Sequence, residues 1–229
     1  MCDIEYKNTV RGIFVSRPNR FIAEVQVGDE IKICHVKNTG RCRELLLPGA
    51  RVILEHSVAE NRKTEYDLIA VYKDDMLINI DSQAPNKVFG EWISSGGFIS
   101  SVDCIKPECR YGDSRFDFYI EARGRRIFAE IKGVTLERDG IVMFPDAPTE
   151  RGVKHVRELM AAVREGSEAC VVFVVQMEDC RYFTPNRETH PALADALIEA
   201  RAAGVGVFAF SCHVTESTLR IAEPVEVRI

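Results

Sequence analysis

The 229-residue sequence lacks any long hydrophobic run. Its apolar stretches, such as residues 169–175, are far shorter than the roughly 20 residues that a membrane-spanning helix needs. The N-terminal segment also lacks the apolar core of a secretory signal, because it is interrupted by four charged residues, Asp3, Glu5, Lys7 and Arg11. These absences predict a cytoplasmic protein with no membrane association.

The sequence also lacks closely paired cysteines. Eight cysteines are present, but no two have the Cys-x-x-Cys spacing, and several lie within apolar, strand-like segments. We therefore predict buried, reduced thiols in a reducing compartment. A structural zinc site is not expected from this spacing.

An excess of positive charge is absent as well. Thirty basic residues are outnumbered by 35 acidic ones, which gives a net charge of −5 at pH 7, and neither half of the chain is basic when it is divided at residue 84. Nucleic-acid-binding domains are usually basic overall, so any such site here must be local. The length and the 46% hydrophobic content predict one or two ordinary globular domains.

The first 84 residues are dominated by short segments rich in Val, Ile, Phe and Tyr, which predict β-strands. These segments are residues 12–17, 20–27, 30–36, 50–56, 64–72 and 76–80. A brief helix is predicted over residues 39–47, before Pro48 and Gly49. Strands interrupted by one helix after the third are typical of a five-stranded OB-like barrel, and such barrels often bind oligonucleotides. We predict that residues 1–84 form a nucleic-acid-binding domain of this kind.

The loops of this predicted barrel carry many polar and basic side chains. They include Arg17, Arg20, Lys37, Asn38, Arg41, Arg43, Arg62 and Lys63. Guanidinium and ammonium groups bind phosphate oxygens. We predict DNA contacts for five of these residues, namely Arg17, Arg20, Lys37, Asn38 and Arg41. The alternative is that they are solvated loop charges.

Residues 85–229 follow a different pattern. Helices are predicted over residues 86–94, 150–165 and 191–203, and strands over residues 98–105, 114–120, 127–134, 169–176 and 205–211. Thr149 is a predicted N-cap for the second helix, and Gly166 a predicted terminator. The order helix, three strands, helix, strand, helix, strand predicts a three-layer α/β domain over residues 85–229.

Ionisable side chains lie in the middle of two strands of this predicted domain. A hairpin centred on Arg123 and Gly124 places Asp117 directly across from Glu130, with Cβ atoms about 4.5 to 5.5 Å apart. Two carboxylates at this separation repel each other unless a cation lies between them. Oxygen ligands favour Mg²⁺ or Mn²⁺. Lys132 shares the face of Glu130 and is suited to orient or deprotonate a water, or to neutralise charge on a phosphate.

These positions predict a metal-dependent phosphodiesterase site. We assign catalytic roles to Asp117, Glu130 and Lys132, and we expect Asp117, Glu130 and Glu91 to bind the metal. The alternative is a salt-bridged, solvent-exposed strand face, which sequences produce often. Alternation along residues 114–120 further predicts that Asp117 lies opposite the face of the neighbouring phenylalanines.

Further basic side chains flank the predicted site. Arg151, Lys154 and His155 lie on the helix over residues 150–165, away from its apolar stripe, and Arg115 precedes Asp117 by two residues. A helix N-terminus with such side chains is suited to bind phosphate, so we predict that all four contact DNA. A solvated helix face is the alternative. Asp146, in the preceding turn, either extends the metal site or caps that turn.

Several sequence blocks match a known family pattern. They are Arg110-Tyr111-Gly112, residues 114–118, residues 130–136 and residues 144–152 with Lys154-His155, together with residues 38–41, 47–49 and 85–86. In these blocks the chain resembles the sugar fermentation stimulation protein A (SfsA) family over nearly its whole length. Two departures are Gly133, where Asn or Ser is expected, and Cys42, where an apolar residue is expected.

The resemblance implies an OB-like domain followed by a restriction-endonuclease-like domain of the PD-(D/E)xK type. The Asp, the acidic residue and the Lys of that motif match Asp117, Glu130 and Lys132. It also implies DNA binding and a regulatory role in sugar use, maltose metabolism included.

We therefore expect a DNA-binding protein whose second domain hydrolyses phosphodiesters with Mg²⁺ or Mn²⁺. One alternative is a catalytically silent, non-sequence-specific DNA-binding regulator of sugar metabolism. Another is a sensor of small ligands from that metabolism. Single- and double-stranded DNA are both candidate partners, and a second copy of the chain in a homodimer is another.

Overall fold

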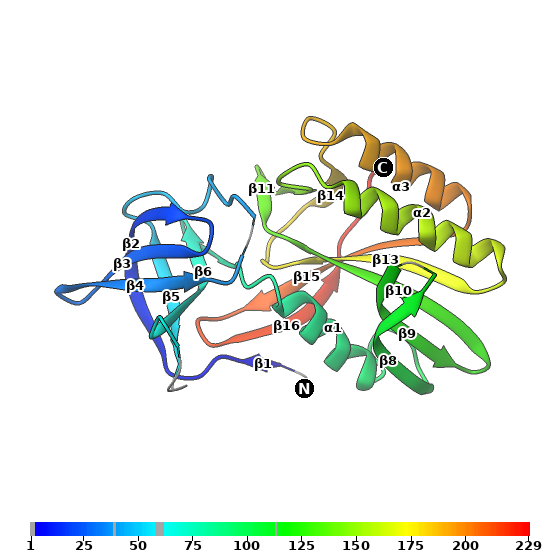
Figure 1. Ribbon diagram of the computed structural model, residues 1–229, viewed down its shortest axis with the longest axis horizontal. Coiled ribbons are helices and arrows are strands. Elements are labelled where there is room, and N and C mark those ends of the chain that lie inside the picture. Colours follow the sequence, from blue (N-terminus) through cyan, green and yellow to red (C-terminus); the bar gives the residue numbers. More distant parts are fainter. Residues whose placement is uncertain (1–2, 39, 58–61, 113) are drawn as a thin grey trace.

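The computed structural model describes residues 3–38, 40–57, 62–112 and 114–229. Figure 1 shows a β-barrel beside a larger α/β domain, with both chain ends on the α/β side. The barrel strands are β2 (Thr9–Asn19), β3 (Ile22–Val27), β4 (Glu30–Val36), β5 (Arg51–His56), β6 (Tyr66–Lys73) and β7 (Met76–Asn79). Their order is β4-β3-β2-β5-β6-β7, and an additional β4–β6 pairing closes the barrel. The predicted OB-like barrel is confirmed.

The barrel interior is filled by alternate residues of its strands. Ala23 and Val25 on β3 are fully buried, and Phe14, Leu54 and Leu68 join them in one hydrophobic core. The same core continues into the α/β domain, where it includes residues of its sheet and helices. The barrel is therefore packed against the second domain through apolar contacts as well as polar ones.

The prediction of a helix over residues 39–47 is wrong. Residues 42–46 form a turn in which the amides of Leu45 and Leu46 donate to the carbonyl of Cys42, while Thr39 lies outside the described residues. Cys42 has a positive φ of 44°, which a right-handed helix does not permit. Leu45 and Leu46 are buried in the hydrophobic core, so tertiary packing determines the path of this segment.

In its described residues, the second domain contains three helices and the remaining strands. They are β1 (Ile4–Glu5), α1 (Ala84–Ser94), β8 (Val102–Tyr111), β9 (Ser114–Ala122), β10 (Arg125–Val134), β11 (Leu136–Arg138), β12 (Ile141–Phe144), α2 (Glu150–Arg164), β13 (Glu168–Val175), β14 (Tyr182–Pro185), α3 (Pro191–Ala202), β15 (Gly206–Val214) and β16 (Thr218–Pro224). The main sheet has the order β1-β16-β15-β13-β10-β9-β8, and β11, β12 and β14 form a small second sheet. Strands β10, β13 and β15 run parallel.

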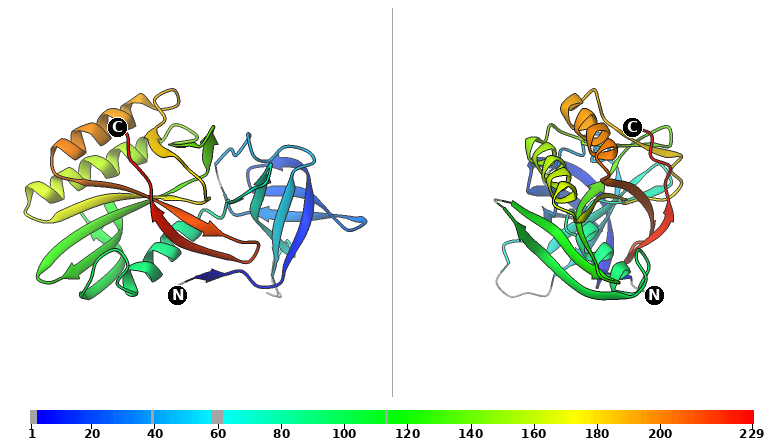
Figure 2. Two further views of the ribbon diagram at one scale, coloured as in Figure 1. Left: turned by 180° about the vertical axis from the view of Figure 1, so that it is seen from behind. Right: turned by 90° about the vertical axis from the view of Figure 1, so that its right-hand side faces the viewer.

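The main sheet lies between two helical layers (Figure 2). Val171 and Phe173 of β13 belong to the core beneath α2 and α3, whereas Val172 and Val174 belong to the core beneath α1. This burial on both faces accounts for the uninterrupted apolar sequence of β13. The predicted three-layer architecture is confirmed.

Helix α2 begins as its sequence predicts. Thr149 is the N-cap, and its Oγ1 accepts a hydrogen bond from the Gly152 amide at 3.1 Å. Its apolar stripe, which includes Val153, Val156 and Leu159, is buried against the sheet. The helix is thereby fixed over the centre of β10 and β13.

Some strands had no clear sequence signal. Strand β8 begins at Val102 instead of at residue 98, and β1, β11, β12, β14 and β16 were not predicted. Strand β1 pairs with β16 in the sheet of the second domain. The chain therefore passes between the domains twice, and the division predicted at residue 84 does not account for β1. We find no helix among the described residues that has the length and apolarity needed to cross a membrane.

Candidate active site

The β9–β10 hairpin has the register that the sequence predicts. Arg123 and Gly124 at its turn both have positive φ, as a two-residue hairpin turn requires, and the pairing runs as far as Phe118 opposite Ala129. Continuing this register places Asp117 across from Glu130. There the backbone pairing gives way to a side-chain contact, because Asp117 Oδ2 accepts a hydrogen bond from the Ile131 amide at 2.7 Å.

Strand β9 does not keep one regular apolar face around Asp117. Phe118 contacts Phe89 of α1, with ring centroids 5.5 Å apart. Phe116 instead packs against Tyr111 and Phe128, in the core on the other side of the sheet. The expected grouping of Phe116 with Phe118 is therefore wrong, and the change of side occurs at Asp117.

Asn86, on the first turn of α1, also binds Asp117. Its Nδ2 donates to Asp117 Oδ1 at 2.8 Å, so each oxygen of this carboxylate has one protein donor. Sequence reasoning assigned no role to Asn86. The one indication of its importance in the sequence is that Pro85-Asn86 belongs to the blocks that match the family pattern. The sequence around Asn86 does not show that α1 begins beside β9.

Glu130 is buried in the middle of β10, with 1% of its surface exposed. Its Oε1 accepts hydrogen bonds from Lys132 Nζ at 2.5 Å and from His155 Nδ1 of α2. Its Oε2 is buried and has no hydrogen-bond partner among the described residues. The two donors converge on one oxygen, and the other is left free for a ligand.

The two carboxylates have opposite electrostatic environments. Burial and the neighbouring charge of Glu130 raise the pKa of Asp117, although the Ile131 amide and Lys132 partly offset the shift. Burial also acts to raise the pKa of Glu130, but the His155 hydrogen bond and the Lys132 charge outweigh it and lower that pKa. A bound cation would relieve the cost of ionising Asp117, since both carboxylates would then face an opposite charge.

The carboxylate pair suits an ion that takes only a few ligands from the protein. Across the described ranges, no group of three or more His, Cys, Asp or Glu residues is arranged to hold a metal ion. Glu91 is exposed and lines a groove of about 890 Å³ that also contains Asp117 and Asn86, so it is not gathered with Glu130. Mg²⁺ commonly uses one or two carboxylates and completes its shell with water and substrate phosphate. The unpartnered Oε2 of Glu130 fits such a role.

His155 does not reach the protein surface. It is 4% exposed, and its Nε2 accepts a hydrogen bond from Arg151 Nε at 3.3 Å while its Nδ1 faces Glu130. The predicted DNA contact by His155 is therefore corrected: α2 directs this ring into the domain, next to the carboxylate. The sequence placed His155 one turn after Arg151, but the position of β10 beneath the helix was not visible in it.

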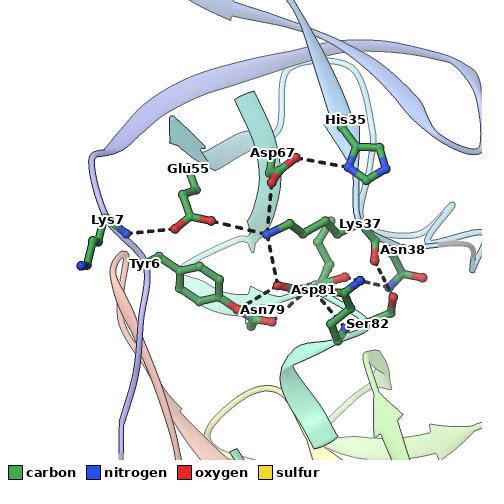
Figure 3. Close-up of polar contacts among 12 residues, drawn as sticks. Tyr6, Lys7, His35, Lys37, Asn38, Glu55, Asp67, Asn79, Asp81 and Ser82 are labelled. Carbon is green, nitrogen blue, oxygen red and sulfur yellow. Dashed lines mark hydrogen bonds and ion pairs between the residues drawn. The ribbon is translucent and has the colours of Figure 1, made fainter. Parts of the chain in front are cut away.

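Lys37 also faces inward. Its Nζ lies 3.1 Å from Asp67 Oδ2, 3.4 Å from Glu55 Oε2 and 3.7 Å from Asp81 Oδ2, at the junction between the domains (Figure 3). The predicted phosphate contact by Lys37 is corrected for this reason, since three carboxylates already neutralise its charge. Asn38 beside it donates from Nδ2 to the Ile80 carbonyl at 2.9 Å, which ties its loop to the interdomain segment.

Arg17 has a structural role in the same loop. Its guanidinium donates to the backbone carbonyls of Arg20, Asn38, Gly40 and Arg41 at 2.7 to 3.0 Å. It thus joins the β2–β3 turn to the loop after β4. These four bonds use most of the donors that were predicted to contact phosphate.

Three other arginines remain available on the barrel. Arg20, Arg41 and Arg43 line a hollow of about 500 Å³, and none of them pairs with a carboxylate of the described residues. The Arg20 guanidinium lies over the ring of Phe21, 4.7 Å from its centroid. On the second domain, Arg115 pairs with Glu108 at 2.9 Å and Lys154 lies 3.7 Å from Glu158, but both side chains are more than half exposed.

The arginine hollow adjoins a second hollow at the domain junction. Gly40 lines both, and the second, of about 310 Å³, is also lined by Gly133, Asp146 and Thr149. Asp146 Oδ2 accepts a hydrogen bond from the Arg41 amide at 3.0 Å. Asp146 therefore links the domains, a role that neither sequence interpretation of this residue included.

These features define a class: a closed OB barrel joined to a three-layer α/β domain, with a half-buried Asp117 and a buried Glu130 on neighbouring strands of one hairpin. Comparison with known proteins agrees with this architecture. Residues 15–80 match the SfsA N-terminal OB domain, and residues 83–218 match the sugar fermentation stimulation protein RE domain. The chain belongs to the SfsA family, the sugar fermentation stimulation proteins.

Individual relatives support the same assignment. A sugar fermentation stimulation protein homolog of Desulfitobacterium hafniense (strain DSM 10664 / DCB-2) is 55% identical over 226 residues, covering 99% of each chain. A homolog of Ruminiclostridium cellulolyticum is 51% identical, covering 99% of this chain and all of that one. The solved structure of Pyrococcus furiosus SfsA in complex with Ca²⁺ is similar with a TM-score of 0.90 at 30% identity, over 99% of this chain and 98% of that one.

Proposed function

We propose that this protein is a divalent-cation-dependent phosphodiesterase that acts on DNA. The observation that carries the proposal is the proximity of Asp117, Glu130 and Lys132, in which a buried Glu130 oxygen has no hydrogen-bond partner among the described residues. Leaving a buried carboxylate oxygen without a partner costs free energy. A cation bound there offsets this cost, and the Ca²⁺ complex described for the Pyrococcus furiosus relative supports a divalent ion.

Each residue of the site has a defined part in hydrolysis. Asp117 and Glu130 would hold Mg²⁺ or Mn²⁺, and the bound ion would supply Lewis-acid stabilisation of charge on the phosphate. Lys132 Nζ has three donors, one of which binds Glu130 Oε1. Its other N–H groups can orient the attacking water or a phosphate oxygen. Addition of water to phosphorus and cleavage of one P–O ester bond give a phosphate monoester and an alcohol.

The barrel is suited to hold the DNA strand. Arg20, Arg41 and Arg43 supply charge and have no carboxylate partner within the described ranges, and Phe21 offers an exposed aromatic ring beside Arg20. Basic grooves with aromatic side chains are typical of single-strand binding. A second hollow shares Gly40 with the first and is also lined by Thr149 and by Gly133, which adjoins Lys132 in sequence. The strand would bind along these two hollows on the barrel and at the domain junction.

The test is cleavage of DNA by the purified chain. Circular and linear DNA, single- and double-stranded, would be incubated with Mn²⁺ or with EDTA, using wild type, Asp117→Asn and Glu130→Gln. We expect product only with the cation and a loss of at least roughly 100-fold in both variants. Glu168→Gln, an exposed carboxylate paired with Arg125, is the matched control and should retain activity. Cleavage at the wild-type rate in both site variants would rule out the proposal.

A second candidate function is DNA binding without cleavage, by a regulator of sugar use. It is favoured by the hydrogen bond of Lys132 to Glu130 and by the lack of a third ligand near the pair in the described residues. It predicts retention of DNA that weakens steeply between about 50 and 200 mM salt, with no product formed. Retention that does not change with salt would exclude it.

A further inference from the structure

We propose that His155 is a positioning residue, which holds Glu130 so that its second oxygen faces the divalent cation, and that Arg151 selects the tautomer of His155 that can do so. The inference rests on the proposed cation site. It assigns to this buried histidine a role that the phosphate-binding interpretation of the helix did not include.

The first step is the tautomer. Arg151 Nε has only a hydrogen to donate, and it lies 3.3 Å from His155 Nε2. His155 Nε2 must therefore accept, which leaves the ring hydrogen on Nδ1. That hydrogen points at Glu130 Oε1. Arg151 and His155 are four residues apart on α2, so the helix itself brings the two side chains together.

The second step concerns how the hydrogen-bond donors are distributed between the two Glu130 oxygens. His155 and Lys132 both donate to Oε1, whereas Oε2 is buried with no partner in the described part of the chain. If these contacts served stability alone, one donor on each Glu130 oxygen would be more stable, because an unpartnered buried acceptor costs free energy. Two donors on one oxygen instead fix the rotation of the carboxylate and keep the other oxygen open.

The third step is rigidity. Val153 and Val156 of α2 are buried in the core beneath the helix, and Thr149 caps its first turn. His155 lies between these anchored positions and is itself 4% exposed. The ring is therefore fixed relative to β10, as the hydrogen-bond partners of metal-binding side chains are in other proteins.

The test is the affinity of the full-length chain for Tb³⁺, used as a luminescent substitute for Ca²⁺, and for Ca²⁺ by calorimetry. His155→Leu removes the donor, and we expect a loss of roughly 10- to 100-fold in affinity. His155→Asn places an amide nitrogen near the position of Nδ1, and affinity within about threefold of wild type is expected. Arg151→Met, on the exposed side of α2, should give a smaller loss because the ring loses its fixed tautomer.

A spectroscopic measurement on the wild-type chain does not depend on the folding of a variant. The ¹⁵N and ¹H resonances of His155 should show hydrogen on Nδ1, and the Nδ1–H resonance should shift when Ca²⁺ is added. The opposite tautomer, or a resonance that does not move on saturation with Ca²⁺, would overturn the proposal. So would wild-type affinity in a folded His155→Leu variant.

The same titrations separate this inference from the proposed function. If Glu130→Gln and Asp117→Asn lose affinity but His155→Leu does not, the cation site stands and the role of His155 is refuted. If none of the three loses affinity, the cation site itself fails. Loss of affinity in His155→Leu with recovery in His155→Asn supports the positioning role, since a cavity or packing defect would not be repaired by the smaller polar side chain.

Discussion

Two buried polar clusters differ in how completely their groups are paired. At the domain junction, Lys37 contacts three carboxylates and Asp67 also binds His35 (Figure 3). Arg62 forms a further ion pair with Asp67. At the candidate site, Glu130 uses one oxygen for two donors and leaves the other without a partner. The difference teaches that the paired network holds the domains together, whereas the unpartnered oxygen of Glu130 is available for the cation that we propose.

The junction cluster also extends across both domains. Tyr6 donates to Asp81 Oδ2 at 3.4 Å and accepts from Asn79 Nδ2 at 3.0 Å. Gln176, just after β13, donates to Asn79 Oδ1 at 2.8 Å and to the Asp81 carbonyl at 3.0 Å. Burial raises the pKa of Tyr6, with a contribution from the Asp81 charge, so its hydroxyl stays protonated as a donor. These bonds fix the orientation of the barrel relative to the site.

The sharpest test of the comparison is Lys37→Met, because it removes the cation shared by the junction carboxylates. We expect the free energy of unfolding to fall by about 3 to 5 kcal/mol, since buried charges are left unpaired. Urea denaturation would measure this loss. Lys32→Met, whose partner Glu30 is exposed, should leave stability almost unchanged because exposed ion pairs contribute little. Equal losses in the two variants would contradict a structural role for the junction.

Glu130→Gln tests the other cluster. We expect its Ca²⁺ affinity to fall roughly 100-fold, equivalent to about 2.8 kcal/mol, because the neutral amide provides one weaker oxygen ligand. Isothermal titration calorimetry would measure the affinity. Lys37→Met, at stabilising conditions, should bind Ca²⁺ as wild type does. A Glu130→Gln variant with unaltered affinity would mean that its free oxygen is not a ligand position.

Gly133→Ser probes the contact between the clusters. A Cβ at residue 133 would lie 2.5 Å from Gln176 Oε1 and 2.7 Å from Pro85 Cγ, so Gln176 must move and strain its bonds to Asn79 and Asp81. We expect a loss of about 1 to 3 kcal/mol in the free energy of unfolding. Gln176→Ala in the same chain should make the serine less costly, as a double-mutant cycle would show. Additive losses would refute the contact.

The smallest expected effect is that of Asp67 on the pH dependence of stability. Burial alone would raise the pKa of Asp67, but hydrogen bonds from Arg62 and Lys37 outweigh it and lower that pKa. The charged carboxylate therefore contributes stability above its unfolded pKa of about 3.9, and this contribution is lost as the pH falls through the folded value. Thermal unfolding between pH 7 and pH 3 should show a shallower decline for Asp67→Asn than for wild type. Parallel curves would contradict this assignment.

Much of the architecture follows from local sequence. Richness in Val, Ile, Phe and Tyr over residues 20–27 and 30–36 predicted β3 and β4, and the apolar residues 169–176 predicted a strand buried on both faces. Thr149 predicted the start of α2. The hairpin centred on Arg123 and Gly124 predicted the register that brings Asp117 to Glu130. These features depend on neighbouring residues, whose side-chain direction is set by the helical or strand period.

Other features were decided only by the tertiary structure. Lys37 and His155 are residue types that are usually solvated or bind phosphate. In the structure, Lys37 lies among three carboxylates from distant segments, and His155 points inward from α2 and contacts Glu130. The pairing of β1 with β16 and the turn at Cys42 likewise depend on segments far apart in the chain. Periodicity determines which way a side chain points along its own element, but its partner depends on how the elements pack, and that contact is made across the sequence.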